Sequence, residues 1–449
     1  MLPAIHSYIR QRYVLNTTAL AYMRIALSVV LLVDLYYRFA NHGAFYSVEG
    51  LWPPQFAKTH APPGSWSIYL LFPSDLFFTI GCAVHALLLI ALLVGWRTVY
   101  ITPLVWFMCY HLQQRNTYVN QGGDSLALIV LLCACFLPWG ERYSIDERHQ
   151  RSSLNFTAAH LIFILSIMLV YTFTVFHKQA PEWRWDGSAI TKTLQLHQLR
   201  SSAGEWLLHY HSLSQMLTWL VLAAEALIPL FLALPVFSKQ ARMGAFFLIT
   251  VLNLGFAIFL RVGLFPFVNI AIALSLLPLK NDQVNKSKDS PFATLIAAAI
   301  FLLSFAVNLT TLPQWPLQLR EPLSFLANVS GLNQNWGMFS PGIIRTDGWY
   351  TSKLLLKDGS YQTIPNELTR SSVEAPLLND RWRKFGENLQ KPGCSFLTTA
   401  YCYYILRKHN GNTPKAHAIM HFLYFHPLQY KTDGSYDLAP AILTSACHE

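Results

Sequence analysis

Long apolar stretches joined by short polar linkers make up residues 1–313 of this chain. Their hydropathy is typical of membrane helices, and they occupy residues 18–38, 76–95, 99–113, 124–139, 154–177, 214–235, 242–260, 263–279 and 292–312. A full crossing of a bilayer takes about 20 apolar residues, so the short third and fourth stretches are expected to be tilted, buried or partly re-entrant. The pattern predicts an all-α polytopic membrane bundle with about nine transmembrane helices.

The pattern changes from residue 314 onward. The segment TSKLLLKDGSYQTI places two strand-like runs around Asp358 and Gly359, which predicts a β-hairpin. In LLNDRWRKFGENLQ the residues Leu378, Trp382, Phe385 and Leu389 recur at helical intervals, and HAIMHFLYFHPL is typical of a strand. We therefore expect residues 314–449 to form a small α+β domain beside a membrane domain at residues 1–313.

The composition supports a membrane protein and argues against a nucleic-acid partner. Hydrophobic residues make up 53% of the chain and charged residues only 12%, whereas a soluble domain carries about a quarter charged residues. The net charge of +10 comes from short basic clusters between the apolar stretches, not from a basic tail or helix. The first apolar stretch lacks a small-residue cleavage site, so we expect a retained span and not a removed signal peptide.

Lysine and arginine residues concentrate on one side of the predicted bundle. With the N-terminus in the cytoplasm, the cytoplasmic segments hold Arg10, Arg12, Arg97, Arg142, Arg148, Arg151, Lys239, Arg242, Lys280, Lys286 and Lys288. Basic residues in short loops mark the cytoplasmic side, and an odd number of spans then puts the C-terminal domain outside. The prediction is a multi-pass protein of the plasma (inner) membrane, embedded in the lipid bilayer, with an extracytoplasmic C-terminal domain.

Seven cysteines divide between the two predicted domains. Four lie in apolar stretches, where packing is their expected role, and the other three are Cys394, Cys402 and Cys447. One of these three must stay unpaired, and Cys394 and Cys402 are too far apart to bridge if both lie in one helix. Pairing through Cys447 is left open. No spacing of cysteine and histidine residues indicates a zinc site, and no metal is predicted.

Glu225 is an acid in the middle of an apolar stretch, VLAAEALIPLF. A charged group in hydrocarbon is costly unless it faces the bundle interior and finds a partner. Glu225 is therefore either a buried acid that fixes helix packing or a group that handles protons or contacts a ligand.

A polar loop, RNTYVNQGGDSL, precedes the fourth stretch on the predicted outer side. Asp124 fits the N-cap of the following helix. Alternatively the loop contacts a substrate or cofactor, because glycines permit close approach of the backbone. The candidate contact residues are Arg115, Asn120, Gln121 and Asp124.

The fifth stretch ends on a His-Lys pair in YTFTVFHKQAPEWRWDG. Lys178 is either an interfacial anchor among tryptophans or a base at the membrane boundary. Desolvation beside apolar residues would lower the pKa of its amine toward the range in which a base works. We expect Lys178 to line a cavity near the polar loop and near Glu182 or Asp186. Trp183 and Trp185 are candidate contact residues beside it.

Six segments, in this order, resemble the HTTM domain family, which includes the membrane module of vitamin K-dependent gamma-carboxylase. They are RIALSVVLLVDLYYRF with FYSVEGLWP, RNTYVNQGGDSL, FLPWGERYSID, YTFTVFHKQAPEWRWDGSAI, GLFPFVNIAIALSLLP and NWGMFSPGIIRTDGWY, within about residues 15–350.

The resemblance implies that Lys178 is a catalytic base, paired in sequence with His177. In the carboxylase the matching lysine deprotonates vitamin K hydroquinone, which then reacts with oxygen. The strong base so formed removes a γ-proton from a glutamate, and carbon dioxide adds to the resulting carbanion. The chain departs from the family's pattern at Asn120 and Gln121, where the carboxylase has an asparagine pair followed by a histidine. Its C-terminal region is also much shorter, at about 130 residues. Both departures weaken the expectation of glutamate carboxylation.

Two functions follow from these observations. The first is an enzyme that uses a reduced quinone and oxygen, with carbon dioxide as a further candidate co-substrate, to modify an exported peptide or protein at the outer face. The second is a non-enzymatic membrane protein for maturation of exported peptides or for immunity, or a small-molecule carrier. A carrier ranks last because the chain shows no convincing internal repeat.

Overall fold

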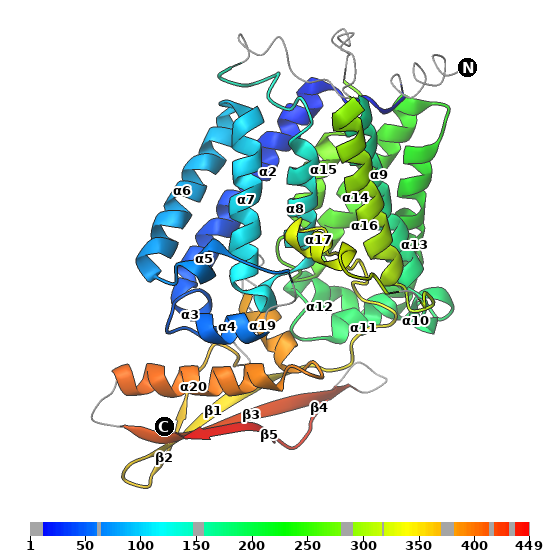
Figure 1. Ribbon diagram of the computed structural model, residues 1–449. Coiled ribbons are helices and arrows are strands. Elements are labelled where there is room, and N and C mark those ends of the chain that lie inside the picture. The colour runs from blue at the N-terminus through cyan, green and yellow to red at the C-terminus, as the bar shows by residue number, and fades with distance from the viewer. Residues whose placement is uncertain are drawn as a thin grey trace.

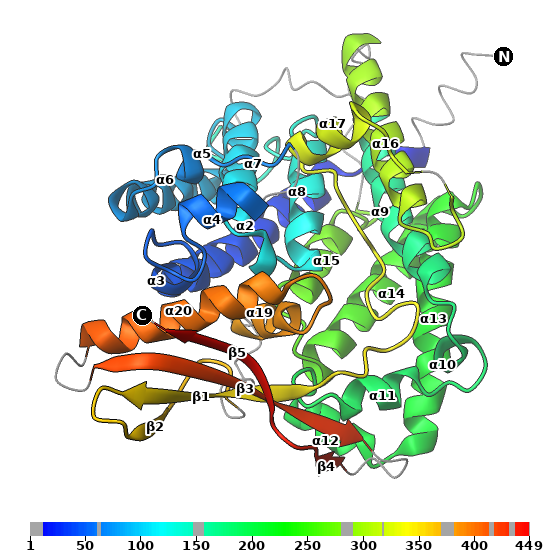
Figure 2. The ribbon, with the colours of Figure 1, turned by 60° about the horizontal axis from the view of Figure 1, so that its bottom comes forward.

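A helical bundle and a smaller sheet domain form the two parts of the structure, a computed structural model (Figure 1). The residues described are 12–60, 64–146, 157–279, 291–316, 318–369, 381–412, 417–430 and 436–448. The sheet lies across one end of the bundle, and the helices α19 (Arg381–Leu389) and α20 (Ser395–Asn412) separate the two (Figures 1 and 2).

One helix coincides with each of the nine predicted stretches. These helices are α2 (Thr17–Ala40), α6 (Asp75–Val94), α7 (Thr98–Arg115), α8 (Gly122–Ala134), α9 (Thr157–His177), α13 (His211–Ala233), α14 (Ser238–Phe259), α15 (Phe265–Leu274) and α16 (Pro291–Thr310). Five of them, α2, α6, α9, α13 and α14, are long and apolar enough to cross a membrane within the described residues. α8 and α15 are apolar but shorter, so the count of nine spans stays a prediction.

Short helices fill the connections. They are α3 (His42–Phe45), α4 (Pro54–His60), α5 (Ile68–Leu71), η1 (Thr117–Val119), α10 (Pro181–Arg184), α11 (Ala189–Gln195), α12 (Ser202–Leu208) and α17 (Leu323–Val329). α3, α4, α10, α11 and α12 lie at the end of the bundle that faces the sheet (Figure 1). α9 ends there at His177, so the His-Lys pair lies on the same side as the C-terminal domain.

Cations gather at the other end of the bundle. Arg12 donates to the carbonyl of Leu234, where α13 ends, and Arg242 in the first turns of α14 donates to the carbonyl of Val14. Arg97 is the N-cap residue of α7. Six of the predicted cytoplasmic cations lie outside the described residues: Arg10, Arg148, Arg151, Lys280, Lys286 and Lys288.

The C-terminal domain is an antiparallel sheet covered on one face by α20, with α19 packed between α20 and the bundle. Its strands are β1 (Gly348–Leu356), β2 (Tyr361–Ile364), β3 (Ala418–Tyr430), β4 (Tyr436–Leu438) and β5 (Ile442–His448). They run in the order β2-β1-β3-β4, and β5 also pairs with β3. The predicted hairpin is confirmed, with Gly359 at φ 83° in its turn. The predicted helix is α19 (Arg381–Leu389), and α20 (Ser395–Asn412) follows it.

A disulfide between Cys402 and Cys447 fastens α20 to β5 across 45 residues of sequence. Pairing therefore runs through Cys447, and Cys394 is a free thiol. His421, opposite Cys447 on the neighbouring strand, brings a third potential metal ligand within 4.8 Å of the two sulfurs. Sulfurs in a disulfide are not thiolates, so in this state the two cysteines cross-link the domain and the group is not a metal site.

Arg24 and Asp34, two buried ionisable residues of α2, have separate partners. Arg24 donates to the carbonyls of Trp139 and Tyr143, whereas Asp34 pairs with Arg38 at 2.7 Å and with Arg381 of α19 at 2.5 Å. The ionic contact to Arg381 joins the membrane bundle to the C-terminal domain.

Candidate functional site

Lys178 and Glu225 form a buried ion pair at the end of the bundle. The amine of Lys178 lies 2.6 and 2.5 Å from the two carboxylate oxygens of Glu225. Lys178 directly follows α9, and Glu225 extends from the middle of α13. The two residues are only 2% and 3% exposed, so neither charge is solvated by water in the way that an interfacial anchor would be.

Lys178 has two further neighbours, Trp183 at its amine and Arg184 at its backbone carbonyl. It lies 4.3 Å from the ring centre of Trp183, which is a cation–π contact. Arg184 donates to the carbonyls of Lys178 and Val175 and so satisfies backbone groups where α9 ends. Burial lowers the pKa of Lys178, the carboxylate of Glu225 opposes this shift, and the charge of Arg184 adds to it.

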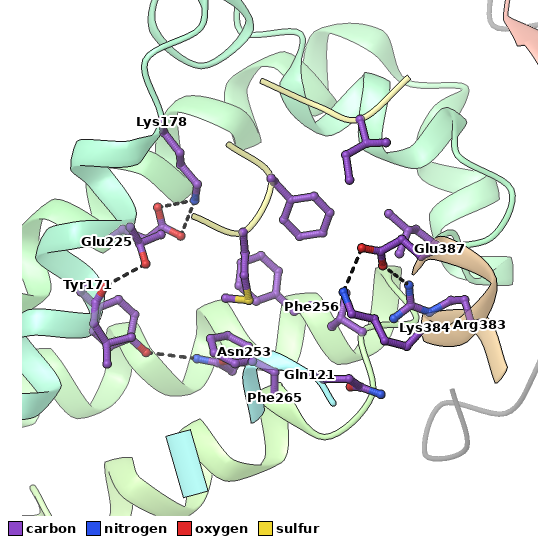
Figure 3. Close-up of a pocket in the computed structure, with 18 residues that line it drawn as sticks. Gln121, Tyr171, Lys178, Glu225, Asn253, Phe256, Phe265, Arg383, Lys384 and Glu387 are labelled. Atoms are coloured by element: carbon purple, nitrogen blue, oxygen red, sulfur yellow. Dashed lines mark hydrogen bonds and ion pairs between the residues drawn. The ribbon is translucent and has the colours of Figure 1, made fainter. Parts of the chain in front are cut away.

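A cavity of about 160 Å³ opens beside the pair (Figure 3). Its wall contains Gln121 and Gly122 from the start of α8, and Tyr171 and Thr174 from α9. Further residues come from α14, α15 and the segment before β1: Asn253, Phe256, Phe265, Met338, Phe339 and Ile344. The polar loop and Lys178 therefore meet at one cavity, as the sequence predicts.

The opposite wall of this cavity belongs to the C-terminal domain. Arg383, Lys384 and Glu387 of α19 reach it, across from Lys178 and Glu225 (Figure 3). Lys384 donates to Glu387 at 2.8 Å. The cavity thus has a charged pair on the bundle side and a charged group on the domain side.

An apolar groove of about 390 Å³ adjoins the same lysine. Its walls are leucine, valine and phenylalanine side chains of α11, α12, α13 and α14, among them Leu217, Val221, Leu252 and Phe259. Lys178, Phe256 and Phe339 line both the cavity and the groove. Leu220 and Val251 line it while being 53% and 49% exposed, so the groove reaches the apolar surface of the bundle.

The structure brings four of the predicted site residues together: Lys178, Glu225 and Gln121 at the cavity, and Trp183 at the groove. The two acids expected near Lys178 have other partners. Glu182 accepts from the backbone of Ile343 and lies 3.5 Å from Lys192, while Asp186 accepts from Ser188. Glu225 is the acid that contacts Lys178.

Three other predicted site residues make structural contacts in the described part of the chain, and a fourth is exposed. His177 bonds to the Thr311 hydroxyl at 2.9 Å, and Arg115 donates to the carbonyls of Trp52, Tyr46 and Ser47. Asn120 donates to the carbonyl of Gln113. Trp185 is 80% exposed. None of these four is among the residues described as lining the cavity or the groove.

The predicted N-cap position of Asp124 is off by three residues. Gln121 is the N-cap of α8, and Asp124 accepts from its backbone at 2.7 Å as the third residue of a capping box. Asp124 also pairs with Arg38 and Arg381. A Cβ on Gly123 would come within 2.7 Å of the backbone of Phe265, so this glycine permits close packing of α8 on α15 and not contact with a ligand.

The sequence patterns above do not predict a polar network that lies in the apolar interior. The Tyr171 hydroxyl donates to Asn269 at 3.1 Å and accepts from Asn253 at 3.4 Å. Both asparagines interrupt apolar stretches of the sequence, and this interruption is the feature from which they are predictable. Arg383, Lys384 and Glu387 were also missed, because the sequence pattern of α19 predicts only an amphipathic helix.

Comparisons with known proteins give no further assignment. No protein-family model matches the chain, no curated protein matches it, and no solved structure matches its fold.

Proposed function

We propose that this chain is a membrane enzyme in which Lys178 is the base toward an acidic hydroxyl of a reduced quinone. The reaction modifies an exported peptide or protein at the outer face of the plasma membrane, as the resemblance to the HTTM family and the carboxylase implies. Addition of carbon dioxide to an acidic residue is one candidate outcome of that reaction.

The observation that carries the proposal is the burial of Lys178 against Glu225 beside a cavity. A cation that serves as a membrane anchor extends toward water, whereas this amine is held inside by two short contacts. A base must be neutral before it accepts a proton, and burial lowers the pKa of Lys178. A proton that passes from the amine to the carboxylate of Glu225 leaves both groups neutral. The pair can therefore supply a free amine without leaving an uncompensated charge in an apolar site.

The groove supports a reduced quinone with an apolar tail as the second component. Its walls are almost wholly apolar and include Lys178, so a tail in the groove would bring a polar ring to the amine. The reduced quinone would supply the acidic hydroxyl and the electrons that oxygen takes up. Lys178 would accept the hydroxyl proton, Glu225 would hold the amine in place, and the side chains of Phe256 and Phe339 would exclude water.

The proposal is tested by comparing Lys178→Arg with Lys178→Ala in purified full-length protein. Arginine preserves a bidentate ion pair with Glu225 but cannot become neutral. Oxygen-dependent oxidation of a naphthoquinol is the readout, and a melting temperature near that of the wild type shows that each variant is folded. We expect both variants to lose activity by about a hundredfold or more, since general-base catalysis contributes roughly a hundredfold to ten-thousandfold. If Lys178→Arg retains wild-type activity, the ion pair is purely structural and Lys178 is not the base. If the wild type itself does not oxidise the quinol, the non-enzymatic function replaces the enzyme.

A further inference from the structure

Three potential metal ligands from separate elements meet in the core of the C-terminal domain. Cys402 lies in α20, His421 in β3 and Cys447 in β5, directly opposite His421 in the sheet. One ligand atom of each side chain lies within 4.8 Å of the other two. All three residues are at most 3% exposed, and the cysteines pack against apolar side chains such as Leu354 and Leu406. Because the ligands come from three elements, the spacing of cysteine and histidine along the sequence does not reveal them.

His421 has the tautomer that a metal ligand needs. Its Nδ1 lies 3.1 Å from the carbonyl oxygen of Cys402, and since a carbonyl can only accept, Nδ1 carries the hydrogen. In a neutral imidazole the lone pair is then on Nε2. Nε2 is buried and has no hydrogen-bond partner among the described residues. Metal-binding histidines commonly donate one ring nitrogen to a backbone carbonyl and bind the metal through the other.

We propose that Cys402, Cys447 and His421 bind one Zn²⁺ when the disulfide is reduced. A dithiol reductant supplies two electrons and two protons, becomes a disulfide itself and leaves Cys402 and Cys447 as thiols. Zn²⁺ then displaces both thiol protons, which pass to water, and binds two thiolates and Nε2 of His421. The two thiolates cancel the charge of the ion, so the complex is neutral, as an apolar interior requires. Three protein ligands leave the fourth position of the ion to a water molecule.

The disulfide and the zinc site exclude each other, since both use the same two sulfurs. Ligand atoms on one tetrahedral zinc lie roughly 3.5–3.8 Å apart. The three atoms already lie within 4.8 Å of one another, so shifts of about 1 Å form the site once the sulfurs are free to separate. Zinc then fastens α20 to β5 in the reduced protein, as the disulfide does in the oxidised protein.

Zinc binding to tag-free, full-length protein in nanodiscs tests the proposal. One sample keeps the disulfide, the other is reduced by a phosphine, and both are stripped of metal before zinc chloride is titrated against a chromophoric chelator. We expect one zinc ion per chain in the reduced sample, and at least about a hundredfold weaker binding in the oxidised sample, which has lost both thiolates. Zinc should also raise the melting temperature of the reduced sample only.

His421→Asn tests the histidine, because it keeps an amide N–H near the place of Nδ1 and removes Nε2. Its reduced form should bind zinc about a hundredfold more weakly, the share of one ligand in a structural zinc site. A disulfide form that melts near the wild type shows that the variant is folded, and His421→Gln makes the same test if it is not. Cys394→Ser is the matched control, since it removes a thiol outside the group and should bind zinc as the wild type does.

Four results would each overturn the proposal. They are no zinc binding by the reduced wild type, equal binding by the reduced and oxidised wild type, undiminished affinity in His421→Asn, and the same loss in Cys394→Ser as in His421→Asn. The first of these would leave the two cysteines as a structural disulfide alone.

Discussion

Arg381 of α19 and Asp34 of α2 are separated by 347 residues and form a buried contact of 2.5 Å. Arg381 also reaches Asp124 of α8, and Arg38 of α2 pairs with both of these acids. Two cations and two carboxylates thus alternate with no net charge. This quartet holds α19 against the bundle, and α19 in turn supplies one wall of the cavity.

Loss of Arg381 should destabilise the protein strongly. Arg381→Met leaves Asp34 and Asp124 with only Arg38 between them, and breaking a buried ionic group costs about 3–5 kcal/mol. Arg407→Met is the control, because Arg407 also joins the C-terminal domain to the bundle, through the carbonyls of Glu49 and Gly50, but at an exposed site. Thermal unfolding in nanodiscs should show a much larger loss for Arg381→Met. Equal losses would mean that the quartet contributes nothing beyond an ordinary surface contact.

Acid should loosen the group around Glu387. Its folded pKa of about 2 lies below the ordinary value of 4.5, so its stabilising effect is present above about pH 4.5 and is lost as the pH falls toward 2. The effect is at most about 3 kcal/mol, since burial of Lys384, which lowers the pKa of that amine, offsets part of it. Glu387→Gln should therefore melt at a lower temperature than the wild type at pH 6. The difference should shrink toward pH 2.5, and a constant difference would contradict the assignment.

The sequence predicts the elements better than it predicts their pairings. Regular hydropathy located nine helices, and turn residues located the hairpin at Gly359, because both signals are local. The position of Glu225 within an apolar stretch predicts a buried partner. Its pairing with Lys178 depends on how α9 packs on α13, which no local pattern specifies. Asp124 illustrates the same limit. A helix-capping contact for Asp124 is predictable, because its partner Gln121 is only three residues away. Its contact with Arg381 is not predictable in this way, because 257 residues separate the two.

The disulfide should protect two of the three cysteines of the C-terminal domain from alkylation. Under non-reducing conditions Cys394 should react with a maleimide, while Cys402 and Cys447 should react only after reduction and unfolding. Cys402→Ser should lower the free energy of unfolding by about 4 kcal/mol, the value expected for a loop of this length. Cys394→Ser is the control and should change stability little. Modification of Cys402 without reductant would show that the bond is absent.

The direction of the bundle can be tested with reporter fusions. Fusions after residues 150 and 285 should report a cytoplasmic position, and a fusion after residue 320 an external one, because Arg97, Lys239 and Arg242 lie at the end of the bundle opposite the sheet. A cytoplasmic reading after residue 320 would place Lys178 on the inner side and would contradict an exported substrate.

Gly255 offers a direct test of the apolar groove. It lies inside α14 and lines the groove, and a Cβ added there would have no atom within 4 Å. Gly255→Leu should therefore fit without a clash while occupying part of the groove. If the groove holds the tail of a reduced quinone, the KM for a quinol with an isoprenoid tail should rise about tenfold, as expected for a few displaced methylene groups. The KM for a tail-free naphthoquinol should not change, and neither should kcat.

The matched control is Gly411→Leu. Gly411 also lies in a helix, α20, with open space around an added Cβ, but it is remote in sequence from the groove residues and exposed. Both variants replace a helical glycine and should gain about 0.5–1 kcal/mol of helix propensity, so stability does not separate them. Only Gly255→Leu should discriminate between the two quinols. If it raises the KM for both quinols equally, or for neither, the tail binds elsewhere. The position of the groove beside Lys178 is then no evidence for quinone binding.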